Sequence, residues 1–233
     1  AARYHPKIRY FLARVNYLCA RRSHNPVQAL EWLSSAARLF DESVHIEAVE
    51  SLMLQIRDQA LSSWSRQQWA EALAGPRNSN EPVPIPKAAI IKPFISNDEP
   101  GAIFISFEHQ WAKLLHLPLL GKLAQQFTLV VSPTWSPPHN ALNIVFPELW
   151  PEKLHCLISN HEDLTTFPRL SSKYQMVSMY ASNWVDEHMF DPLPKSERDI
   201  DLVMLANFAL YKRHYLLFSA IRSLPENLKI VLV

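Results

Sequence analysis

Short apolar runs alternate with amphipathic stretches after residue 86, and this alternation limits the fold more than any other feature. The longest amphipathic stretches between the runs are 110–126 and 214–223. Strand–helix–strand alternation with continuously apolar strands is typical of a parallel sheet covered by helices on both faces. We therefore predict an α/β fold with an all-parallel sheet. The predicted buried strands are 88–92, 102–107, 128–131, 155–158, 175–179, 200–205 and 228–233.

The first 80 residues show helical periodicity instead. Asn25 followed by proline is typical of a helix N-terminus, and Ser43 is placed to cap a third helix. Ser65 and Gln68 form a capping-box pattern for a fourth helix, which should end at Gly75. The apolar residues of the first helix repeat at the spacing of one face: Ile8, Phe11, Leu12, Val15, Leu18 and Cys19.

A proline-rich segment, 76–86, separates the helical region from the α/β region. Such segments are stiff and extended, so we place a boundary there. At its other end the chain stops inside an apolar run, 230–233, and it starts without methionine. We therefore expect it to be a fragment of a longer protein.

Composition excludes several classes of protein. The chain has 23 Lys+Arg against 22 Asp+Glu, which argues against a nucleic-acid-binding protein that relies on phosphate contacts. Its three glycines, Gly75, Gly101 and Gly121, are far apart. That spacing excludes the glycine-rich dinucleotide fingerprint, the Walker P-loop and the hydrolase nucleophile elbow.

Two further patterns bear on location. No apolar run approaches the roughly 20 residues that span a bilayer, and no secretory signal is present. Cys19 and Cys156 can form neither a disulfide framework nor a four-cysteine zinc site. These patterns favour a cytoplasmic protein without a transmembrane segment, and they leave peripheral membrane association open.

Polar and aromatic residues follow the predicted strands at their carboxyl ends, where α/β sheets bind ligands. Some have a simpler role: Ser159 and Asn160 suit the capping of a short helix near Asp163. Capping does not explain the excess of aromatic and histidine side chains, which suits a sugar or similar polyol. The acceptor-side candidates are Glu108, His109, Trp135, Ser136 and His139. We predict no metal site, because His161-Glu162-Asp163 lacks a second histidine at helical spacing.

Several motifs resemble glycosyltransferases. Residues 182–186, Ser-Asn-Trp-Val-Asp, and 190–192, Phe-Asp-Pro, look like the Asn-Gly-Val-Asp…Phe-x-Pro signature that ends the first domain of glycosyltransferase family 4 enzymes. Residues 104–108 and 132–139 are similar to a first domain of glycosyltransferase group 1 proteins. Residues 200–207 with Lys212 resemble the opening of the donor domain. The likeness covers roughly 86–233.

The resemblance implies a two-domain enzyme of the GT-B type. A helical region at 1–80 would precede a Rossmann-like acceptor-side domain at 81–195, and 196–233 would begin a truncated Rossmann-like donor-binding domain. By analogy Lys212 would neutralise the leaving diphosphate, with Arg213 and Asn207 beside it. The family arginine falls on Asn207, and Trp184 replaces the signature glycine.

The activity implied is transfer of a sugar from a nucleotide-sugar donor to a carbohydrate or other acceptor. The anomeric configuration would be retained, with no cofactor or metal. The fragment alone should be inactive, and the catalytic residues stay unidentified. Two alternatives remain open: a non-catalytic interaction protein with a degenerate glycosyltransferase-like sheet, and a nucleotide-sugar epimerase. A solvated lysine that opens a helix accounts for Lys212 equally well.

Overall fold

The computed structural model describes residues 5–75, 85–133, 137–180, 199–206, 214–223 and 228–232, together with residues 183, 186, 188, 194 and 197. The chain divides into two compact units. The larger is Tyr4–Trp184, and the smaller includes Val185–Val233. Each unit is described separately below.

The larger unit begins with the four predicted helices: α1 (Pro6–Arg22), α2 (Pro26–Ala37), α3 (Ser43–Ser63) and α4 (Arg66–Ala74). Asn25 Oδ1 accepts a hydrogen bond from the Gln28 amide at 3.1 Å, which confirms the predicted cap of α2. Ser65 and Gln68 form the predicted capping box, and Gly75 ends α4 at φ 92°. Ser43 does not cap α3: it is the first helical residue, and Glu42 holds the cap position without a side-chain hydrogen bond.

Five strands follow and form one sheet in the order β1-β2-β3-β4-β5. They are β1 (Ala89–Lys92), β2 (Gly101–Ser106), β3 (Phe127–Ser132), β4 (Leu154–Leu157) and β5 (Tyr174–Val177). Strands β2 to β5 pair in parallel, as predicted, whereas β1 pairs antiparallel with β2 and is exposed throughout. The all-parallel prediction is therefore wrong at this edge. The connection 93–100 is too short for the crossover that a parallel pair requires.

Between the parallel strands lie α5 (Glu108–Ala112), the 3₁₀-helix η1 (Lys113–His116), α6 (Leu120–Gln126), α7 (Ala141–Leu149) and α8 (Asp163–Leu170). The single helix predicted over 110–126 is thus three short ones. The break falls at Leu117, which has ψ 124°. A residue before proline avoids the helical region, and Pro118 follows.

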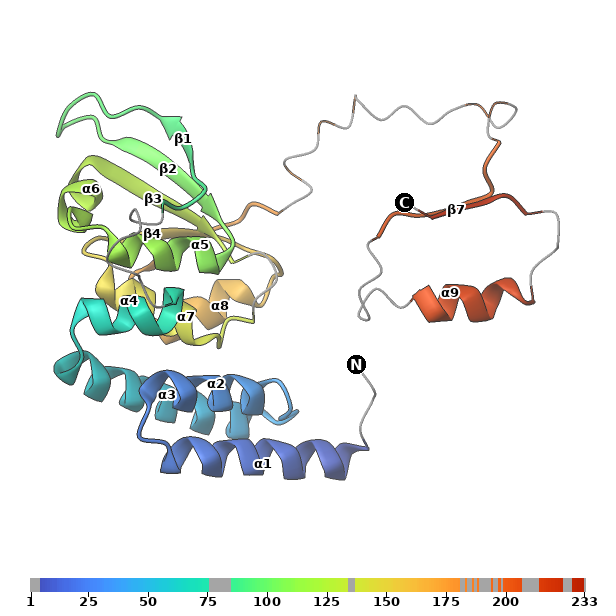
Figure 1. Ribbon diagram of the computed structural model, residues 1–233, viewed down its shortest axis with the longest axis horizontal. Coiled ribbons are helices and arrows are strands. Elements are labelled where there is room, and N and C mark those ends of the chain that lie inside the picture. Colours follow the sequence, from blue (N-terminus) through green and yellow to red (C-terminus); the bar gives the residue numbers. More distant parts are fainter. Residues whose placement is uncertain are drawn as a thin grey trace. The chain divides into compact units, whose positions relative to one another are not determined.

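In the described part of the larger unit, the helices pack on one face of the sheet rather than on two, as Figure 1 shows. Crossovers between parallel strands are nearly always right-handed, so a sheet with strands in sequential order receives all of them on the same side. Side chains on the covered face belong to the main core cluster: Ile105, Leu129, Val131, Leu154, Cys156 and Tyr174. On the opposite face, the cross-strand row of Phe104, Val130 and His155 is only half-buried. Coverage of both faces was therefore the wrong prediction.

Helices α1 to α3 form a further layer beyond α7, on the side away from the sheet (Figure 1). Helix α7 turns Phe146 toward the sheet, while Ile144 and Val145 belong to a second core cluster with α2 and α3. Helix α7 is buried from Ala141 to Pro147, as expected of a helix that is apolar on most of its surface and packs between two layers. Trp69 and Ala70 of α4 are fully buried, one in each cluster. The helical and α/β regions therefore share continuous packing.

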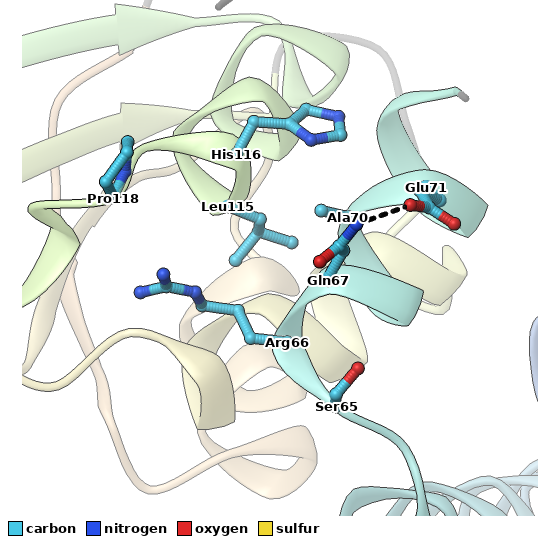
Figure 2. Close-up of a pocket in the computed structure, with 8 residues that line it drawn as sticks. All are labelled: Ser65, Arg66, Gln67, Ala70, Glu71, Leu115, His116 and Pro118. Carbon is cyan, nitrogen blue, oxygen red and sulfur yellow. Dashed lines mark hydrogen bonds between the residues drawn. The ribbon is translucent and has the colours of Figure 1, made fainter. Parts of the chain in front are cut away.

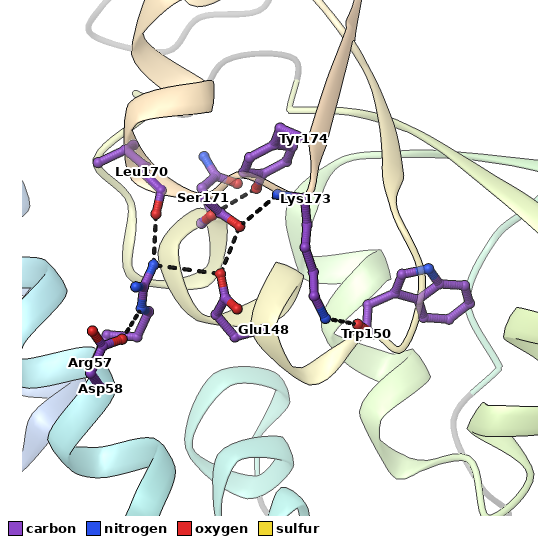
Figure 3. A network of polar contacts seen from close by, with 9 residues as sticks. Arg57, Asp58, Glu148, Trp150, Leu170, Ser171, Lys173 and Tyr174 are labelled. Atoms are coloured by element: carbon purple, nitrogen blue, oxygen red, sulfur yellow. Dashed lines mark hydrogen bonds and ion pairs between the residues drawn. The ribbon is translucent and has the colours of Figure 1, made fainter.

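A polar network also joins α3 to the α/β region (Figure 3). Arg57 Nη1 donates to the Leu170 carbonyl oxygen at 2.6 Å and lies 3.6 Å from Glu148 Oε1. Ser171 Oγ donates to the same carboxylate oxygen at 2.6 Å. Arg57 is largely buried, so its charge is stabilised by these partners rather than by water.

The smaller unit contains a strand–helix–strand: β6 (Leu202–Met204), α9 (His214–Ile221) and β7 (Ile230–Leu232). Strands β6 and β7 pair in parallel, with Val203 opposite Val231. Lys229 Nζ is 2.6 Å from Asp199 Oδ2, and the Lys229 amide donates to Asp201 Oδ2 at 2.8 Å. Among the described residues of the whole chain, no helix is both long enough and apolar enough to cross a membrane.

Candidate functional site

The carboxyl ends of β2 to β5 meet at one edge of the sheet because these strands are parallel. Phe107 follows β2, and Glu108 and His109 come next as the first residues of α5. Ser159 and Asn160 follow β4. Of the acceptor-side candidates, Glu108 and His109 therefore lie at the predicted edge, Glu108 half-buried and His109 exposed.

Phe107 makes the turn from β2 into α5 with φ 63° and ψ 120°. Among the described residues, Phe107 alone combines a positive φ with a side chain other than that of glycine. A positive φ is unfavourable for a residue with a Cβ, because the Cβ comes too close to the backbone. The Phe107 amide donates to the Ser132 carbonyl oxygen at 3.1 Å, which ties the turn to β3. The ring is 43% exposed and lies 5.8 Å from the His109 ring. Strained residues of this kind cluster at functional sites.

Substituting Phe107 tests the strain. We expect Phe107→Gly to be about 1 kcal/mol more stable than Phe107→Ala, because glycine adopts positive φ without a Cβ clash. At an ordinary position the order is reversed by a similar amount. Urea unfolding of both variants measures the difference. An alanine variant that is more stable than the glycine variant by about 1 kcal/mol would show that the turn stores no strain.

His139 lies in the loop after β3, and its side chain contacts the helical layer. Its Nε2 donates to Glu50 Oε1 of α3 at 2.8 Å. Arg169 of α8 donates to both oxygens of the same carboxylate, at 2.9 and 3.2 Å. His139 and Glu50 are both largely buried, whereas Arg169 is half exposed. The imidazole predicted to face an acceptor therefore holds a carboxylate in the helical layer.

The pKa of Glu50 reports how strongly this cluster binds the ionised carboxylate. Burial alone would raise that pKa, because an apolar surrounding disfavours the charged form. The hydrogen bonds from His139 and Arg169, with the charges on both, outweigh burial and lower the pKa from 4.5 to about 2. The cluster therefore stabilises the folded chain at every pH at which Glu50 is ionised.

The loop after β4 is organised by reciprocal capping. Asp163 is buried, and its Oδ2 accepts hydrogen bonds from the amides of Ser159 and Asn160 at 2.7 and 3.0 Å. Asn160 Oδ1 accepts in turn from the amides of Glu162 and Asp163. The capping prediction is confirmed for Asn160, whereas Ser159 takes part through its backbone amide. The side chains of Asn160 and Asp163 therefore stabilise the start of α8.

A cavity of about 560 Å³ opens between α4 and η1, away from this edge (Figure 2). Arg66 and Glu71 line it from α4, and His116 from η1. Gln67 donates to Glu71 Oε1 at 3.0 Å across one helical turn. A second cavity of about 520 Å³ lies by the amino ends of β3 and β4, near Thr128 and His155. Within the described ranges, no group of three His, Cys, Asp or Glu side chains is arranged to hold a metal ion.

Five predicted site residues lie outside the described residues: Trp135, Ser136, Asn207, Lys212 and Arg213. Sequence reasoning missed three residues that the structure brings forward, namely Glu50, Phe107 and Arg169. Glu50 and Arg169 carry no local signal, because Glu50 meets His139 across 89 residues of chain and Arg169 across 119. Phe107 also carries no local signal, because a positive φ is normally predicted only at glycine or asparagine.

Comparison of the chain with family models, with curated proteins and with solved structures finds no match in any of the three.

Proposed function

We propose that the larger unit is the acceptor-side part of a glycosyltransferase that takes its sugar from a nucleotide-sugar donor. The smaller unit would begin the donor-binding part. In this proposal the acceptor binds at the carboxyl edge of β2 to β5, and the donor diphosphate is held near Lys212, Arg213 and Asn207. Transfer would proceed with retention and without a metal, and the protein would work in the cytoplasm.

The observation that carries the proposal is the division of the chain at Trp184–Val185. Parallel strand–helix–strand structure lies on both sides of this division, in β2 to β5 and in β6-α9-β7. The division falls inside the segment 182–192 that resembles the end of a family 4 first domain. A GT-B enzyme places its two Rossmann-like domains on either side of that segment. The position of the boundary therefore supports the proposal of a glycosyltransferase.

The described edge residues have chemistry that suits a sugar. A ring such as Phe107, exposed beside His109, can stack against the apolar face of a pyranose. Glu108 and His109 can exchange hydrogen bonds with hydroxyl groups. At the donor, charge develops on the leaving phosphate, and a preorganised cation there stabilises the transition state more than the ground state. Lys212 would supply that cation.

A turnover assay tests the proposal. The protein at its full natural length is incubated with UDP- and GDP-hexoses, and release of nucleoside diphosphate is followed with and without added glycan acceptors. We expect acceptor-stimulated release with one nucleotide. No release of either nucleotide under any condition would overturn the proposal.

A non-catalytic interaction protein is the second candidate. It is favoured by the engagement of His139 with Glu50, which commits one predicted edge residue to packing between layers. The replacement of the family arginine by Asn207 points the same way. The turnover assay separates the two candidates, because an interaction protein releases no nucleotide.

A further inference from the structure

Helix α1 turns its large apolar side chains outward. It packs on the rest of the unit through Ala13 and Ala20, which are 0% and 1% exposed. The apolar stripe expected to face the core lies on the opposite side, where Phe11 is 65% exposed and Leu18 45%. Ile8 and Val15 of the stripe are exposed as well, whereas its other two members, Leu12 and Cys19, are half-buried. Figure 1 shows α1 as the outermost helix of the larger unit, beyond α2 and α3.

Basic side chains border this stripe. Lys7, Arg14 and Arg21 follow one another at seven-residue spacing, so they form a row along one flank of the stripe, and all three are exposed. Arg9 and Arg22 are the other charged residues of α1, which carries five basic residues and no acidic one. Arg9 is paired with Asp41 at 2.8 Å on the packed side. The outward face is therefore both apolar and cationic, although the whole chain has a net charge of only +1.

We propose that α1 lies on an anionic membrane surface, with Ile8, Phe11, Val15 and Leu18 inserted at the boundary of headgroups and acyl chains. Interfacial helices combine an apolar face rich in Phe and Leu with Lys and Arg beside it. Anionic lipids attract each basic residue near the surface, and long basic side chains can reach the headgroups while their stems stay apolar. The inference is independent of the proposed sugar transfer.

The charge pattern favours a lipid surface over the other occupants. A second copy of the chain would bring another helix with five basic residues and no acidic residue against this one, so the rows of like charge would repel. Docking helices of proteins usually flank their apolar seam with charges of both signs, which set the partner and the register. A flat anionic surface requires only basic charges and no defined register. An outermost helix can contact such a surface along its whole length.

Vesicle co-sedimentation of the full chain tests this proposal. We expect binding to phosphatidylcholine vesicles that contain 30% phosphatidylglycerol, no binding to pure phosphatidylcholine, and release at high salt. Phe11→Ser with Leu18→Ser should weaken binding at least about tenfold, because it removes inserted apolar area. Replacing Lys7, Arg14 and Arg21 with glutamine should weaken it about 100-fold, because each basic residue contributes roughly fivefold.

A matched control replaces two exposed apolar residues elsewhere. Ile95 and Leu119 are 62% and 67% exposed, so Ile95→Ser with Leu119→Ser should bind like the parent chain. Thermal melting checks that every variant folds; all changed side chains are exposed, and we expect little effect. Absence of binding to anionic vesicles overturns the proposal, as does equal loss in the control. The proposal would also be overturned if the chain formed dimers that dissociate only when Phe11 and Leu18 are changed. A second copy of the chain would then be the occupant of this face.

Discussion

Replacing Glu50 with glutamine should lower the free energy of unfolding by about 3 kcal/mol at neutral pH. The carboxylate is 9% exposed and accepts hydrogen bonds from His139 and from Arg169. Glutamine keeps the shape but loses the charge, so the buried imidazole and the guanidinium lose their common partner. A buried ionic cluster that loses one member leaves uncompensated polar groups, which is the costly case.

The same substitution should change the pH dependence of stability. The pKa of Glu50 falls from 4.5 to about 2 on folding, so the unfolded chain binds the proton more readily. The stabilisation is therefore complete above pH 4.5 and is lost as the pH falls toward 2. Urea unfolding of the parent chain and Glu50→Gln at several pH values should show a difference that is large at pH 7 and small near pH 2.

A matched control is Glu31→Gln, which removes an exposed carboxylate from α2. We expect it to change stability by less than about 0.5 kcal/mol at any pH. A Glu50 variant that matches this control at pH 7 would contradict the role given to the cluster. A difference that persists unchanged to pH 2 would show that Glu50 acts through packing rather than through its charge.

The second large effect concerns Lys212. If this residue neutralises the leaving diphosphate, Lys212→Ala should lower the turnover of the full-length protein by about 100-fold or more. Loss of one preorganised stabiliser of transition-state charge typically has an effect of this size. The measurement is nucleoside diphosphate release at saturating nucleotide sugar.

Lys229→Ala is the control in the same unit. Lys229 is exposed and paired with Asp199, so its removal should leave turnover within about twofold of the parent. Equal turnover in the Lys212 variant and the parent would mean that Lys212 is a solvated lysine, and the diphosphate site would have to be sought elsewhere.

Local signals predicted much of the secondary structure. The caps at Asn25 and Ser65 act through residues three positions away, so they could be recognised in the sequence. Four parallel strands were recognised because strands buried within a sheet read as short apolar runs. The helix predicted over 110–126 failed at Pro118, whose effect on Leu117 outweighs the amphipathic pattern.

The way in which the helices and strands pack together could be predicted less well from the sequence. The strand order decides which face of the sheet receives the helices, and apolar runs do not encode that order. The stripe on α1 shows the same limit, since periodicity identifies an apolar face but not its partner. Ala13 and Ala20 allow α1 to approach closely on the other side, and the large side chains remain outside.

The sequence placed Glu108 and His109 at the carboxyl end of a strand, and this placement is confirmed because only Phe107 separates them from the end of β2. His139 belongs to a longer loop, whose side chains can turn to either side of the fold. Its partners Glu50 and Arg169 come from α3 and α8, and only the packed structure brings the three together. The strain at Phe107 likewise depends on the tie to Ser132 of the neighbouring strand.

Calorimetric titration of the full-length protein with UDP- and GDP-sugars tests the central proposal most directly. Sugar transfer from a nucleotide donor predicts saturable heat with one nucleotide class, reduced in Lys212→Ala and unchanged in Lys229→Ala. Absence of heat with every nucleotide sugar would contradict it, and the α/β units would then be interpreted as an interaction scaffold.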